Sequence, residues 1–86
     1  MRFCSSVVNV NPEQAKLWLS NNPNNRPINT LKVNKYAKMM KNGLWNFKES
    51  TPIQINKNEV LINGQHRLSA ILQTGLTVKM RIQKLI

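Results

Sequence analysis

A short polar turn follows an apolar stretch in the second half of the chain, and its side chains could bind an anion. The apolar run 60–62 and the amphipathic run 68–72 flank the turn residues Asn63, Gly64, Gln65, His66 and Arg67. This order predicts a buried strand, a tight turn and the first turn of a helix. Amide groups at a helix start lack intrahelical partners and carry the positive end of the helix dipole. We therefore expect a phosphate or carboxylate site at residues 63–67.

Three of these residues suit a phosphate for separate reasons. Gly64 would let a ligand approach the backbone closely, because glycine has no side chain. Arg67 offers a planar fork that matches phosphate oxygens, and a protonated His66 would add a charge-assisted hydrogen bond. The alternative is an ordinary strand-to-helix turn with two solvated side chains, since short motifs carry a high false-positive risk.

The charge balance favours an acidic partner and limits the possible catalysis. The chain has 86 residues and a net charge of +10, from 13 Lys and Arg against 3 acidic residues. Nucleic acid, a nucleotide or another anionic partner is the expected ligand, and a basic domain without a specific partner is the alternative. Carboxylates are confined to Glu13, Glu49 and Glu59. Paired-carboxylate catalysis and two-metal nuclease sites are therefore not expected.

Cysteine and histidine usage argue against a structural metal or a disulfide. Cys4 and His66 are single residues of their kind, so the chain has neither a disulfide pair nor the ligands of a zinc cluster. The chain also has no apolar run near 18 residues and no apolar signal-peptide core. We expect a cytoplasmic protein with no membrane partner and no metal ligands.

Hydrophobic periodicity and turn residues predict the order β-α-α-β-β-α-β. Strands are expected at 5–10, 52–56, 59–62 and 77–82, and helices at 12–20, 30–42 and 65–74. This order predicts one small α+β domain over residues 1–86, with a mixed sheet. The side chains expected to face inward are Ala15, Trp18, Leu19, Val33, Tyr36, Ala37, Met40, Leu68, Ile71, Leu72, Val78, Met80 and Ile82.

The second predicted helix carries a basic stripe and ends beside aromatic residues. Its lysines recur every three residues, at Lys32, Lys35, Lys38 and Lys41. We favour a face that contacts nucleic acid, where each lysine would release a counterion. A solvated face that keeps the protein soluble is the alternative. Trp45 and Phe47 could stack bases, although such pairs more often close a core at a helix end.

Several segments, in order, resemble the ParB/sulfiredoxin-like domains of phage and mobile-element proteins. Residues 62–68 resemble the D-G-Q-H-R-[LI] signature of these domains, and residues 25–28 resemble their N-R-P segment. Met39, Gly43 and Trp45 resemble the end of their second helix, and Ile53 falls on the strand before the signature. The similarity covers roughly residues 7 to 83. It implies the same β-α-α-β-β-α-β fold, and it places Arg26 near the ligand cleft.

The resemblance also indicates which chemistry of the family this chain could keep. Sulfiredoxins have a reactive cysteine where this chain has Gln65, and an amide cannot act as a thiolate nucleophile. Partitioning ParB proteins hold a nucleoside triphosphate and its metal with a Gly-Glu-Arg-Arg segment. Here Gln65 replaces the Glu and His66 replaces the first Arg. Phosphate binding is therefore expected to survive better than metal-supported hydrolysis. A ParB-type helix-turn-helix is not expected.

These observations leave three hypotheses about function. The first is a binding module for a nucleotide or for DNA or RNA, in which residues 63–67 and Arg26 hold phosphate and the basic stripe extends the contact. The second is a nuclease or an NTP-dependent phosphotransferase or hydrolase, with His66 as general acid or base, Arg67 as charge stabiliser and an NTP with Mg²⁺ as cofactor. The third is a small inhibitor that docks on a host nucleic-acid machine, such as a defence complex.

Overall fold

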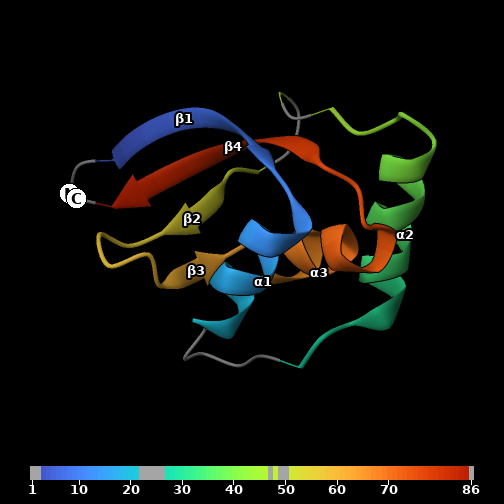
Figure 1. Cartoon of the computed structure of the whole chain (residues 1–86), viewed down its shortest axis with the longest axis horizontal. Helices are drawn as coiled ribbons and strands as arrows, with labels where there is room; N and C mark the ends of the chain where they lie inside the picture. The colour runs from blue at the N-terminus through green and yellow to red at the C-terminus, as the bar shows by residue number, and fades with distance from the viewer. Residues whose placement is uncertain (1–2, 22–26, 47, 49–50, 86) are drawn as a thin grey trace.

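The predicted order of helices and strands is confirmed. The computed structural model describes residues 3–21, 27–46, 48 and 51–85. Its elements are β1 (Phe3–Val10), α1 (Pro12–Ser20), α2 (Thr30–Lys41), β2 (Ile53–Ile55), β3 (Leu61–Asn63), α3 (Gln65–Thr74) and β4 (Val78–Leu85). Together they form a small α+β domain, with the strands side by side and the helices gathered next to them (Figure 1).

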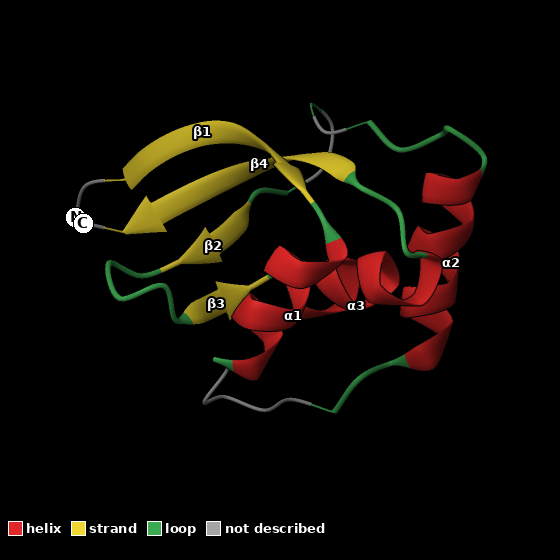
Figure 2. Ribbon diagram, viewed as in Figure 1, coloured by secondary structure: helices red, strands yellow, loops and turns green. Residues whose placement is uncertain are grey.

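The strands form a mixed four-stranded sheet in the order β1-β4-β2-β3. β1 pairs with β4 along its whole length in antiparallel register, from Phe3 opposite Leu85 to Val10 opposite Val78. β2 lies parallel to β4, and β3 returns antiparallel to β2 (Figure 2). Because β2 and β4 are parallel, the chain needs a crossover between them, and α3 supplies it. The start of α3 is thereby placed directly after the edge strand β3.

Side-chain caps explain where the first two helices begin. Asn11 accepts a hydrogen bond from the Gln14 amide at 2.8 Å, and Pro12 occupies the first helical position. Asn29 accepts from the amides of Leu31 and Lys32 at 3.0 and 3.3 Å. α3 differs, because its N-cap is Gly64, which has no side chain to cap the helix. The first amides of α3 therefore have no side-chain cap from that residue.

The core lies between the helices and one face of the sheet. Met80 and Ile82 of β4 and Ile53 of β2 are buried, whereas Lys79 and Val7 on the other face are exposed. α3 packs against both α1 and α2. The predicted inward positions of α1, α2 and β4 are confirmed, with Leu19 and Tyr36 half-buried against the core. The described helices are all too short to cross a lipid bilayer.

Two details of the sequence prediction are wrong. Leu72 is 41% exposed, and the buried residues of α3 are Arg67, Leu68, Ala70 and Ile71. Glu59 lies outside the strand predicted for 59–62, because it takes a positive φ of 61° directly after the turn at Lys57 and Asn58. The strand begins only at Leu61.

Gly64 is required where β3 turns into α3. Its backbone is left-handed, with φ of 119°, and the residue is buried. A Cβ at this position would clash with Cδ1 of Ile53 and lie 3.3 Å from its Cγ2. The absence of a side chain at Gly64 therefore leaves room for the buried side chain of Ile53 in β2. This packing reason differs from the close ligand approach expected from the sequence.

We expect Gly64→Ala to lower the free energy of unfolding by about 2–4 kcal/mol, because it adds both backbone strain and a steric clash. Gly75→Ala is the matched control. Gly75 also has a positive φ, of 70°, but nothing lies within 4 Å of its Cβ position. It should lose only about 1 kcal/mol. Urea denaturation followed by circular dichroism measures both losses, and equal losses would contradict the packing role of Gly64.

Candidate phosphate-binding pocket

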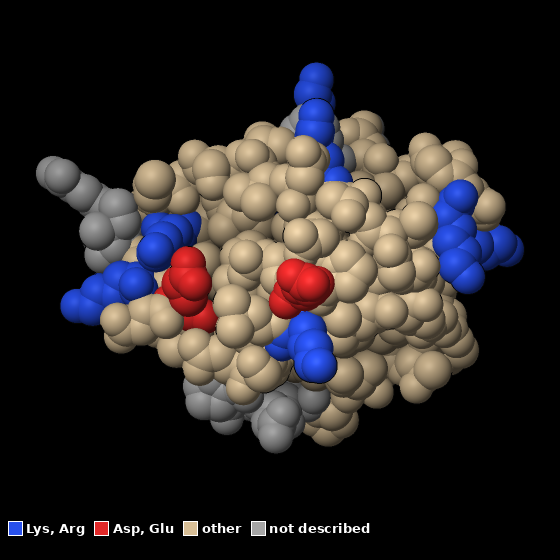
Figure 3. All heavy atoms as spheres, in the orientation of Figure 1, with Lys and Arg blue, Asp and Glu red and all other residues tan. Residues whose placement is uncertain are grey.

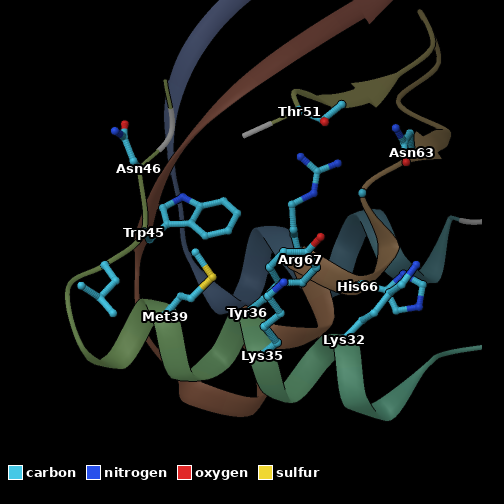
Figure 4. A pocket seen from close by; sticks show the side chains of 12 residues that line it. Lys32, Lys35, Tyr36, Met39, Trp45, Asn46, Thr51, Asn63, His66 and Arg67 are labelled. Carbon is cyan, nitrogen blue, oxygen red and sulfur yellow. The ribbon is translucent and has the colours of Figure 1, made fainter. Parts of the chain in front are cut away.

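A pocket of about 590 Å³ opens between α2 and the turn from β3 into α3. Figure 4 shows side chains from both sides directed into it. Its lining residues are Lys32, Lys35, Tyr36, Met39, Leu44, Trp45, Asn46, Thr51, Asn63, Gly64, His66 and Arg67. The turn predicted to bind an anion therefore forms one wall of a real pocket, and α2 forms another.

Arg67 is the charged group at the centre of this site. It is only 7% exposed, and its guanidinium points into the pocket between Trp45, Thr51 and Asn63 (Figure 4). Its Nη2 donates to the Pro52 carbonyl oxygen at 3.5 Å, a long and weak hydrogen bond. On the described part of the chain, neither Glu13 nor Glu59 forms an ion pair with it, and Glu59 pairs with Lys84.

Burial has an electrostatic consequence for this guanidinium. Loss of hydration lowers the pKa of Arg67 from its ordinary value, and the nearby Tyr36 phenol acts in the opposite direction. A lowered pKa means that the folded protein disfavours the charged form. Arginine nevertheless stays protonated in proteins, so the pocket holds a poorly solvated positive charge. An anion entering the pocket would restore the interactions that this charge lost.

His66 has a structural role that the sequence did not indicate, because it links two helices through a hydrogen bond. Its Nε2 accepts a hydrogen bond from the backbone amide of Asn29 at 2.9 Å. An accepting Nε2 carries no proton, so the ring is neutral in this arrangement. The bond joins the first turn of α3 to the N-cap of α2. His66 lines the pocket, but this nitrogen is already engaged.

The basic stripe of α2 is divided by the fold. Lys32 and Lys35 line the pocket, whereas Lys38 and Lys41 do not. A three-residue spacing turns by 300° around a helix of 100° per residue, so the stripe drifts away from the pocket. In Figure 3 the Lys and Arg side chains lie in separate groups, one of them over α2, without forming a continuous patch on that face.

The remaining predicted site residues are placed as follows. Asn63 ends β3 and lines the pocket, and Gly64 lies beside it. Gln65 begins α3 and is half-buried, but it is not among the lining residues. Arg26 and Phe47 lie outside the described residues. The described residues contain no group of three His, Cys, Asp or Glu side chains placed to hold a metal ion.

The apolar wall of the pocket is the part that sequence reasoning missed. Tyr36 was expected only as a core residue, yet it also faces the pocket together with Met39 and Leu44. Asn46 and Thr51 add polar groups to the lining. The available signal was Trp45, an aromatic residue directly after a basic helix, but its spacing could not separate a core position from a pocket wall.

Comparisons of the chain with models of known protein families, with curated protein sequences and with solved structures find no match. The resemblance to ParB/sulfiredoxin-like domains therefore depends on the motif residues alone.

We expect His66→Ala to free the Asn29 amide and to lower the free energy of unfolding by roughly 1–2 kcal/mol, because a hydrogen bond and a half-buried ring are lost. Hydrogen exchange at the Asn29 amide, measured by NMR, should become fast relative to the wild type. Gln73→Ala is the control, since Gln73 also joins α3 to α2, through Asn34 at 3.1 Å. Continued protection of Asn29 in His66→Ala would contradict this role.

Proposed function

We propose that this protein is a phosphate-recognising binding module, with a nucleotide or a nucleic acid as its ligand, bound in the pocket between α2 and the start of α3. The observation that carries the proposal is the buried guanidinium of Arg67, which points into that pocket. Lys32 and Lys35 on the facing helix add two positive charges. None of the described lining residues is acidic.

The energetics of burial support a binding role for Arg67. A buried cation is expensive to desolvate, and replacing it by an apolar side chain is often neutral or stabilising. The weak bond to Pro52 offsets little of this penalty. A residue that lowers stability in the free protein is expected where binding needs it. The uncapped start of α3 adds amides and a positive dipole end next to the same space.

Binding is better supported than catalysis. A general acid or base must reach the proton that it transfers, and Nε2 of His66 is engaged by Asn29. The described lining also lacks a carboxylate that could help to hold Mg²⁺. The motif that resembles ParB/sulfiredoxin-like domains contributes Asn63, Gly64, His66 and Arg67 to the lining, which supports membership in that family. We therefore favour a family member that binds phosphate without turnover.

We expect Arg67→Met to weaken binding of a phosphate ligand about tenfold or more, because a charge-assisted contact is lost. Its melting temperature should stay equal or rise, because the substitution removes a buried charge that forms no ion pair with a described carboxylate. The matched control is Lys41→Met, which removes the same charge outside the pocket and should bind almost as wild type. Calorimetric titration with ATP, CTP and GTP, with and without Mg²⁺, measures the affinities. Unchanged binding in Arg67→Met would contradict the proposal.

If the ligand is a polynucleotide, its binding should depend steeply on salt. We expect the double variant Lys32→Ala/Lys35→Ala to reduce the slope of log K against log salt by about 1–2, because each phosphate contact releases a counterion. The double variant Lys38→Ala/Lys41→Ala has the same net charge and should keep most of the slope. Fluorescence anisotropy with labelled oligonucleotides between low and physiological salt gives both slopes. Equal slopes in the two variants would place the contact elsewhere.

A further inference from the structure

The pocket has an apolar wall in addition to its cationic one. Tyr36, Met39, Leu44 and Trp45 line it together with Arg67 and the two lysines of α2. Leu44 is 66% exposed, so apolar surface is left open to solvent at this site. A phosphate group by itself makes no favourable contact with such an apolar surface. A ligand that fills the whole pocket must join an anionic group to an apolar or aromatic one.

Trp45 is held as a fixed aromatic surface in this wall. Its Nε1 donates to the Lys79 carbonyl oxygen on β4 at 3.1 Å. Its ring meets Tyr36 edge to face, with centroids 5.9 Å apart and planes at 85°. Trp45 also packs against the core and remains half-buried. Since the only polar atom of the indole already donates to Lys79, the part of Trp45 that lines the pocket is apolar and aromatic. In Figure 4 the ring and the Arg67 guanidinium both point into the pocket.

We propose that Trp45 stacks on an unpaired nucleobase, so that the ligand of this pocket is a nucleoside phosphate, either free or as part of a single strand. This inference rests on the proposed phosphate site and extends it. Base–aromatic stacking is tolerant of base identity, because every base has a π face. Paired bases in a duplex have their faces covered by neighbouring bases and cannot reach Trp45. A volume of about 590 Å³ lies in the usual range for small-molecule sites.

The first experiment separates the contribution of the base from that of the phosphate. AMP, CMP, GMP and UMP are compared with ribose 5-phosphate and with inorganic phosphate by calorimetric titration. At least one nucleotide should bind about tenfold more tightly than ribose 5-phosphate, because stacking adds affinity. Binding of that nucleotide should also change the tryptophan fluorescence. Trp18, the other tryptophan of the chain, is 5% exposed and does not line the pocket.

A matched pair of variants tests whether Trp45 is the stacking surface. Trp45→Phe and Trp45→Leu both lose the hydrogen bond to Lys79, so they share its structural consequence. Only the phenylalanine keeps an aromatic face. The ratio of nucleotide affinity to ribose 5-phosphate affinity should stay within about threefold of the wild-type ratio in Trp45→Phe and fall to about one in Trp45→Leu. This ratio is insensitive to a general loss of stability. The fluorescence change should disappear in both variants.

Two further ligands distinguish the sources of the base. The first is a 5′-phosphorylated single strand of thymidylate, compared with the mononucleotide of the same base. Tighter binding of the strand would identify a strand as the ligand, and weaker binding would identify a free nucleotide. The same strand annealed into a duplex should bind the pocket much more weakly.

The outcomes separate this inference from the function on which it rests. Equal affinity for nucleotides and ribose 5-phosphate, with both lost in Arg67→Met, would leave the phosphate site intact and overturn the stacking role of Trp45. An unchanged ratio of nucleotide affinity to ribose 5-phosphate affinity in Trp45→Leu would also overturn the stacking role. Binding of neither phosphate nor nucleotide by the folded protein would overturn both proposals.

Discussion

The turn from β3 into α3 packs directly on Ile53 of β2, and that packing is possible only because Gly64 has no Cβ. After the left-handed backbone at this residue, the first turn of α3 reaches Pro52 through Arg67 and Asn29 through His66. Arg67 is thereby carried beneath the surface, and His66 is brought to the N-cap of α2. These two consecutive side chains form one wall of the pocket, and residues of α2 form another.

The site contains groups that do not help to stabilise the fold. A buried guanidinium and an exposed Leu44 both work against stability, the first by desolvation and the second by apolar exposure. Trp45 and His66 have the opposite effect, since each donates or accepts a hydrogen bond that ties separate segments together. A buried cation with only a weak hydrogen bond to the described residues, held among bonded neighbours, is what a preorganised anion site requires. This contrast is the physical basis for interpreting the pocket as a binding site.

Much of the fold could be predicted, because its signals are local. Asn11 and Asn29 cap the first two helices with their own side chains, and Val78, Met80 and Ile82 alternate on the buried face of β4. The failure at Leu72 has a different cause. A spacing rule places Leu72 with Leu68, but α3 packs between α1 and α2, and this arrangement centres its buried arc on the Arg67 side. Which arc of a helix is buried depends on its neighbours, which the helix's own sequence does not contain.

By itself, the sequence determined the order of elements, the strongly basic character and the turn at residues 63–67, since caps, alternation and charge are properties of neighbouring residues. The tertiary structure alone decided that Arg67 is buried, that Nε2 of His66 is engaged and that the lysine stripe is divided. It also decided that Trp45 faces the same pocket as Arg67. Each of these facts depends on segments distant in sequence meeting around α3, because a pocket is made of surfaces that only the packed chain brings together.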